Sequence, residues 1–173
     1  MQSETSRPPT LVSASRNSTV TAGVGDTDVL TGIENITGGS GNDVLTGAAG
    51  NDMLVGAAGV DQLYGGDGDD VLNGGAGNDL LVAGGMSDRL KGGSGADVFV
   101  FVNQYLYDTA TGIGPHVVTD FTAAEDALLM DFTAEGTAQA SFDDFMANAR
   151  QAGTDVVYVN PSDGWRIRLL DVD

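Results

Sequence analysis

Large apolar residues recur every nine positions through the middle of the chain. Residues 38–100 divide without gaps into seven nonapeptides, and the eighth place of every unit is apolar. The first five places are mostly Gly, Ala, Asn or Ser, so each unit predicts a glycine-rich turn followed by a strand of about three residues. The eighth side chain of each unit points inward and its neighbours point outward. These inward residues are Leu45, Leu54, Leu63, Leu72, Leu81, Leu90 and Phe99.

Strands this short cannot fold alone, so we expect the units to stack as parallel coils. With two nonapeptides in each coil, two short parallel sheets face each other across a thin leucine core. The predicted fold class is all-β, a parallel β-roll (β-solenoid) that occupies residues 20–101. Residues 1–19 are rich in Ser, Thr, Arg and Pro, and they are predicted to form a flexible linker.

The remaining residues, 102–173, are not repetitive and carry a core pattern of their own. Alternating apolar and polar residues predict strands. A helix is predicted over residues 141–153, with Ser141 as its N-cap and Gly153 as its stop. We expect this segment to be a small β-rich cap, containing one helix, that covers the last coil. The predicted strands lie in residues 116–121, 126–132, 155–160 and 165–171.

The sixth place of every nonapeptide is aspartate. Since successive units lie on opposite sides of the roll, these aspartates form two columns. Adjacent coils lie roughly 4.8 Å apart, and two ionised carboxylates at that spacing repel by about 1 kcal/mol in water and by several times more in a half-buried turn. The columns therefore need a cation. One column holds Asp43, Asp61, Asp79 and Asp97, and the other holds Asp52, Asp70 and Asp88.

The residue types of the turns indicate which cation this is. Carboxylate and backbone carbonyl oxygens, with no His or Cys nearby, suit calcium rather than zinc or copper. Magnesium fits less well because it retains water and a tight octahedron. The glycines let the turns adopt positive φ and direct their carbonyl groups at an ion. A solvated acidic face would explain single aspartates, but not seven at a strict spacing of nine.

Composition limits the other partners and activities. The net charge of −18, from 25 acidic and 7 basic residues, repels nucleic acid and anionic membranes. The chain has no cysteine, and its single histidine, His116, is predicted to be structural. The sequence therefore offers almost no residues that could form a zinc site or a catalytic triad. No apolar run is long enough for a membrane span or a signal-peptide core. We expect a monomer that does not insert into membranes.

The repeat resembles the calcium-binding nonapeptide G-G-x-G-x-D-x-U-x of the RTX (hemolysin-type) family, whose parallel β-roll is a C-terminal module of type I-secreted proteins. GADVFVF followed by HVVTDFTAAEDALLMDF is similar to the segment that closes the roll in secreted RTX proteases and lipases. The resemblance implies calcium ions held between same-side turns by the seven aspartates and by loop glycines. Those glycines are Gly39, Gly41, Gly50, Gly56, Gly59, Gly65, Gly68, Gly74, Gly77 and Gly92.

The columns also predict the number of ions. The same-side pairs 43/61, 61/79, 79/97, 52/70 and 70/88 give five, and Glu34 with Asp52 would give a sixth. In the sixth unit Met86 replaces the fourth glycine and Gly84–Gly85 are shifted by one, so the site with Asp88 is expected to be the weakest. Alanines in two units are expected to be tolerated if their φ angles are negative. They are Ala48, Ala49, Ala57 and Ala58.

The function that the resemblance implies is non-catalytic. The module would stay unfolded at low cytosolic calcium, leave the bacterial cell through a type I secretion apparatus without an N-terminal signal peptide, and fold on calcium outside. The alternative is a calcium-dependent adhesion or carbohydrate-binding module for a polysaccharide, as in the repeat modules of alginate epimerases. An exposed aromatic or basic groove would favour that alternative. An enzyme such as a metalloprotease is not expected, since no H-E-x-x-H or G-x-S-x-G motif occurs.

Overall fold

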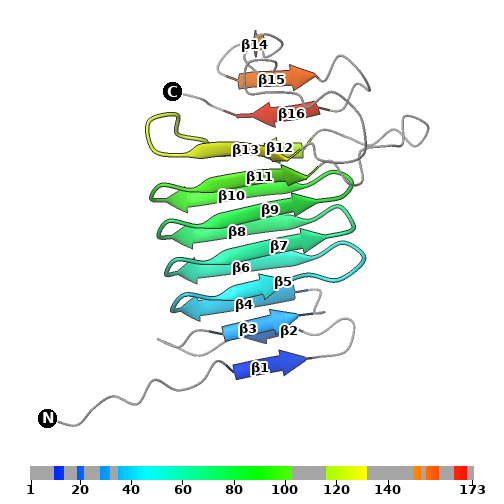
Figure 1. Cartoon of the computed structure of the whole chain (residues 1–173), viewed down its shortest axis with the longest axis vertical. Coiled ribbons are helices and arrows are strands. Elements are labelled where there is room, and N and C mark those ends of the chain that lie inside the picture. Colours follow the sequence, from blue (N-terminus) through cyan, green and yellow to red (C-terminus); the bar gives the residue numbers. More distant parts are fainter. Residues whose placement is uncertain are drawn as a thin grey trace, which may run out of the picture.

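The computed structural model describes residues 10–13, 19–21, 28–31, 35–102, 116–131, 150–152, 155–159 and 166–170. In this part of the chain every regular element is a strand. The strands stack as rungs along the long axis of the molecule, with β1 near one end and β14 and β15 at the other (Figure 1). None of the described residues belongs to a helix that would reach across a bilayer.

The chain alternates between two sheets as it climbs the roll. The 7-stranded sheet is parallel throughout and has the order β1 (Thr10–Ser13), β3 (Asp28–Thr31), β5 (Val44–Thr46), β7 (Gln62–Gly66), β9 (Leu80–Gly84), β11 (Val98–Val102), β13 (Ala127–Asp131). The 9-stranded sheet has the order β2 (Thr19–Thr21), β4 (Asn35–Ser40), β6 (Met53–Ala58), β8 (Val71–Ala76), β10 (Arg89–Ser94), β12 (His116–Val118), β16 (Arg166–Leu169), β15 (Asp155–Val159), β14 (Arg150–Ala152).

Equivalent residues of neighbouring strands lie opposite each other, which builds the core. In one sheet Leu45 is opposite Leu63, and Leu63 is opposite Leu81. In the other sheet Leu54 is opposite Leu72. All seven predicted eighth-place residues have an exposed fraction of 0%. The predicted parallel β-roll with two nonapeptides in each coil is therefore confirmed.

Both sheets continue beyond the repeats. Strand β12 pairs in parallel with β10, and β13 pairs in parallel with β11, so the first strands after residue 101 add a further coil. Strand β16 then pairs in parallel with β12, and β15 and β14 follow as antiparallel strands. The side chains of Val118 and Ile167 extend the core at 0% exposure, and Phe121 packs on Phe99 with ring centroids 6.1 Å apart. The four strands predicted for this segment are confirmed.

Two predictions made from local composition are wrong where the structure describes them. Residues 10–13, placed in a flexible linker, form β1 and pair with β3. Residues 150–152, placed in a helix, form β14 and pair with β15. The rest of that predicted helix lies outside the described residues, as does Glu34. The physical reason is the same for both strands, since pairing with a strand distant in sequence outweighs a local preference.

Candidate metal centre

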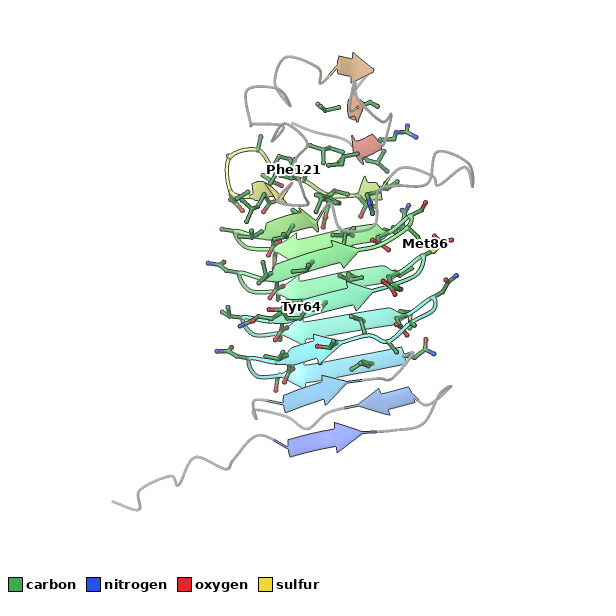
Figure 2. All side chains as sticks on the ribbon, turned by 45° about the vertical axis from the view of Figure 1, so that its right-hand side comes forward. Tyr64, Met86 and Phe121 are labelled. Carbon is green, nitrogen blue, oxygen red and sulfur yellow. The ribbon has the colours of Figure 1, made fainter. Side chains whose placement is uncertain are left out.

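The glycine-rich turns adopt the backbone conformation that their sequence requires. Most second and fourth places have positive φ, as at Gly75 (φ 113) and Gly77 (φ 135), where residues with a side chain are strained. Among the described residues, two other than glycine also adopt it, Ala57 (φ 83) and Met86 (φ 66). The alanines are expected to be tolerated if their φ angles are negative, and Ala57 does not meet this condition. Met86 lies in a turn at the edge of the roll, whereas Tyr64 lies on a strand (Figure 2).

The sixth unit keeps the register of the others. Gly84 lies directly opposite Gly66, and both have positive φ, 99 and 103 respectively. The glycine pair of this unit, which stands one place later in the sequence than in its neighbours, therefore does not shift the strand. Backbone pairing with β7 holds the strand in place although the fourth glycine of this unit is replaced.

The seven sixth-place aspartates are buried, with exposed fractions of 0–3%, and the structure brings them into the two predicted columns. One carboxylate oxygen of five of them, Asp61, Asp70, Asp79, Asp88 and Asp97, accepts a hydrogen bond from the backbone N–H of the aspartate one coil earlier. The N–H of Asp43 donates to Oδ1 of Asp61 at 2.8 Å, and the N–H of Asp61 donates to Oδ1 of Asp79 at 2.9 Å. The same bond joins Asp79 to Asp97, Asp52 to Asp70 and Asp70 to Asp88, each at 2.9 Å.

The second carboxylate oxygen of four of these aspartates, Oδ2 of Asp61, Asp70, Asp79 and Asp88, is buried without a hydrogen-bond partner. In the first three, Oδ2 lies beside the first-place glycine of its own unit and beside a carbonyl oxygen of the next coil. A Cβ atom at Gly56, for example, would collide with Oδ2 of Asp61 and would lie 2.6 Å from the carbonyl oxygen of Gly74. Two acceptor oxygens thus face the same small space, and no hydrogen-bond donor of the described residues occupies it. A cation in that space would be stabilised by both oxygens.

The pKa values of the aspartates show how unfavourable their charge is without a cation. Burial raises the pKa of Asp70 to about 7, and the carboxylates of Asp88 and Asp52 add to this, against the hydrogen bond from the Asp52 N–H. Burial likewise raises the pKa of Asp97 to about 6. It is also the largest cause of the raised pKa values of Asp61, Asp79 and Asp88. A bound cation would reverse this balance, because it stabilises the ionised form.

The donor set fits calcium. Among the described residues no three His, Cys, Asp or Glu side chains gather as a metal site, so a site here has to combine a carboxylate with backbone carbonyls. Calcium takes six to eight oxygen ligands and readily accepts carbonyl groups. Zinc prefers nitrogen and sulfur ligands, and the chain has no cysteine.

Both columns end on residues that lie outside the seven regular nonapeptides. In one column the N–H of Asp97 donates to Oδ1 of Asp126 at 2.9 Å. Oδ2 of Asp126 accepts the N–H of Thr122 at 2.7 Å, as the carboxylate of Asp52 accepts the N–H of Ala48 at 2.7 Å. In the other column the N–H of Asp88 donates to Nδ1 of His116 at 3.3 Å.

The sequence does carry a signal for these two end residues. TGIGPHVVT, residues 111–119, has glycine in its second and fourth places, His116 in the sixth and Val118 in the eighth. FTAAEDALL, residues 121–129, has Asp126 in its sixth place and Leu128 in its eighth. These copies are separated from the seven regular units by residues 101–110, so counting in unbroken nines misses them.

Comparison with known proteins agrees with this geometry. The family model of the RTX calcium-binding nonapeptide repeat matches the chain in four copies, at residues 28–63, 55–85 and 82–100. These residues belong to that family, and they are calcium-binding repeats rather than a catalytic domain.

Comparison with curated proteins gave no match. Among solved structures, the chain is similar to the solution structure of the AlgE6R3 subunit from the Azotobacter vinelandii mannuronan C5-epimerase. The two are 24% identical with a TM-score of 0.42, and the match covers 79% of this chain and 80% of that chain.

Proposed function

We propose that this chain is a module of a secreted protein that folds when calcium binds outside the cell, after export by a type I secretion apparatus. The observation that carries the proposal is the set of buried Oδ2 atoms of Asp61, Asp70 and Asp79, which have no hydrogen-bond partner. Calcium supplies the charge that these oxygens need. An ion that binds only the folded chain adds about 4 kcal/mol of stability at a thousandfold excess over its Kd, so the calcium concentration decides whether the roll forms.

The ligands that we propose lie in adjacent turns of one column. The lower turn supplies the Oδ2 atom of its aspartate, and the upper turn supplies the carbonyl oxygen of its first residue. The fourth-place glycines add a second set of carbonyls: the carbonyl oxygens of Gly41, Gly50, Gly59 and Gly77 each face the fourth-place glycine one coil later, and Gly68 has the same place. Gly39, with φ 128, turns the backbone between these two positions.

The number of ions follows from the same geometry. A carboxylate oxygen faces a first-place carbonyl of the next coil in five pairs: Asp43 with Gly56, Asp61 with Gly74, Asp79 with Gly92, Asp52 with Gly65, and Asp70 with Ala83. We therefore expect the folded chain to bind five calcium ions, which native mass spectrometry after calcium loading would count. Binding of none, or of only one or two ions, would contradict the two-column arrangement.

Calcium binding is expected to weaken as the pH falls. The pKa of Asp70 in the folded chain without calcium is raised from 3.8 to about 7. A raised pKa means that the folded state binds more protons, so this stabilisation of the calcium-free fold is present below the ordinary pKa and is lost as the pH rises through about 7. Calcium requires the ionised carboxylate and competes with the proton. In the unfolded chain these carboxylates are already ionised above about pH 5.5, so protonation in this range stabilises only the calcium-free fold. The β-structure that remains in chelator, followed by circular dichroism, should therefore be greater at about pH 5.5 than at about pH 8, and equal spectra at the two pH values would contradict this.

One observation favours the second candidate function, binding of an acidic polysaccharide. Although the chain carries a net charge of −18, the exposed side chains of Arg89, Lys91 and Arg168 share the outer face of the 9-stranded sheet. Arg89 lies opposite Val117, and Val117 lies opposite Arg168, so the two arginines are roughly 10 Å apart. A row of cations on a flat sheet suits a linear polyanion.

Removing two of these charges tests that candidate. The double variant Arg89→Gln and Lys91→Gln is expected to bind a polyuronate about tenfold more weakly, a loss of roughly 1.4 kcal/mol, in affinity electrophoresis at fixed calcium and low salt. The control is Asn42→Asp with Gln62→Glu, which makes the same change in net charge at exposed positions away from this sheet face. Equal binding by both variants would show that these cations do not form a binding surface.

A further inference from the structure

The upper end of the column that holds Asp52, Asp70 and Asp88 differs from every other step of either column. The coil above Asp88 provides His116 where the other steps provide an aspartate. Nδ1 of His116 lies 3.2 Å from Oδ2 of Asp88, and the two side chains are 4% and 0% exposed. Oδ2 of Asp88 is buried without a hydrogen-bond partner, like Oδ2 of Asp61, Asp70 and Asp79, but beside Asp88 an imidazole nitrogen occupies the adjacent space.

The first place of the same unit differs as well. It holds Ala83, where the other six units hold glycine. A Cβ atom at Gly65, one coil earlier in the same column, would lie 2.5 Å from Oδ2 of Asp70, so an alanine in this place does not allow the carboxylate position that the glycines permit. Ala83 is fully buried. Its methyl group therefore takes up the space beside which the other turns hold Oδ2.

The imidazole ring also contacts an aromatic side chain of the core. The ring of Phe101 packs against His116, with centroids 5.2 Å apart and planes tilted by 52°. His116 itself is 3% exposed. Its backbone is paired with β16, opposite Ile167. The imidazole ring is thus buried at the edge of the core, where it packs against Asp88.

From these contacts we infer that Asp88 and His116 close this column without a metal ion. The imidazole ring and the Ala83 methyl group take the places that a calcium ion and a glycine take at the other turns. The inference rests on the proposed calcium binding and adds to it that the chain ends one column of ions with its own side chains. The step below, from Asp70 to the carbonyl of Ala83, keeps its ligands, so the last ion of this column lies there.

The direct test is crystallographic and uses the full chain crystallised with calcium. Anomalous difference density is expected between Oδ2 of Asp70 and the carbonyl oxygen of Ala83, with none within ligand distance of Oδ2 of Asp88. An anomalous peak on Asp88 and His116 would overturn the inference and leave the proposed function standing. If no calcium bound at any turn, the proposed function would fail, and this inference with it.

A matched pair of variants gives the same answer in solution. Asp70→Asn and Asp88→Asn make the same change one coil apart in one column. Asparagine retains an Oδ1 acceptor, so Asp88→Asn keeps the bond from the Asp70 N–H and removes the charge with almost no change in side-chain size. By native mass spectrometry we expect Asp88→Asn to bind as many ions as the wild-type chain, and Asp70→Asn to bind one fewer. Loss of one ion from Asp88→Asn would overturn the inference.

Discussion

Adding calcium to the chelator-treated chain is expected to convert residues 20–100 from a largely disordered state into the β-roll. Without calcium the folded state buries seven aspartates at 0–3% exposure, and the raised pKa values of Asp61, Asp70 and Asp79 show that their ionised forms are disfavoured there. At neutral pH, unfolding relieves this by exposing the carboxylates to water. Calcium removes the penalty in the folded state, so the equilibrium should shift by several kcal/mol.

Circular dichroism and the radius of gyration measure this transition. Both signals are expected to change together between chelator and about 10 mM calcium, with a gain in β-structure and in compactness. This calcium concentration saturates even the weak sites that are typical of extracellular modules. Magnesium at the same concentration is the control for ionic strength and for divalent charge. Spectra and dimensions that do not differ between chelator and calcium would refute calcium-driven folding.

Deleting residues 102–173 is expected to weaken calcium-driven folding more than any single change of an aspartate to alanine. The deletion removes β12 and β13, which pair with β10 and β11, and exposes Leu90 and Phe99, now buried at 0%. It also removes Asp120, whose carboxylate oxygens accept the N–H groups of Gly92 and Gly93 at 3.0 and 2.9 Å. An uncovered end coil leaves strand edges and apolar surface in water.

The matched comparison is Asp79→Ala, which removes one Oδ2 ligand and the bond from the Asp61 N–H but leaves both sheets intact. We expect the calcium midpoint to rise roughly threefold for Asp79→Ala and at least about tenfold for the truncated chain, as linkage between ion binding and folding predicts. Calcium titrations of the two variants and of the full chain would measure this. A truncated chain with the midpoint of the full chain would show that the segment is not a cap, and would favour a separate binding domain there.

Where the repeat is regular, the sequence by itself determined the fold and the candidate site. A period of nine with an apolar eighth place leaves few ways to bury Leu45, Leu54 and their equivalents, and stacking is the one that also pairs the strand backbones. The same period places Asp43 under Asp61 and Asp52 under Asp70, so both columns follow from spacing alone. The glycines in the second place also follow, since positive φ is unfavourable for other residues.

Only the tertiary structure decided how the repeat begins and ends. Thr10–Ser13 and Arg150–Ala152 are strands because they pair with β3 and β15, and nothing near them in sequence encodes those partners. Asp126 and His116 extend the two aspartate columns, but residues 101–110 interrupt the period that would have identified them. Whether a carboxylate such as that of Asp88 meets a carbonyl group or an imidazole depends on the coil stacked above it, which is a property of the folded chain.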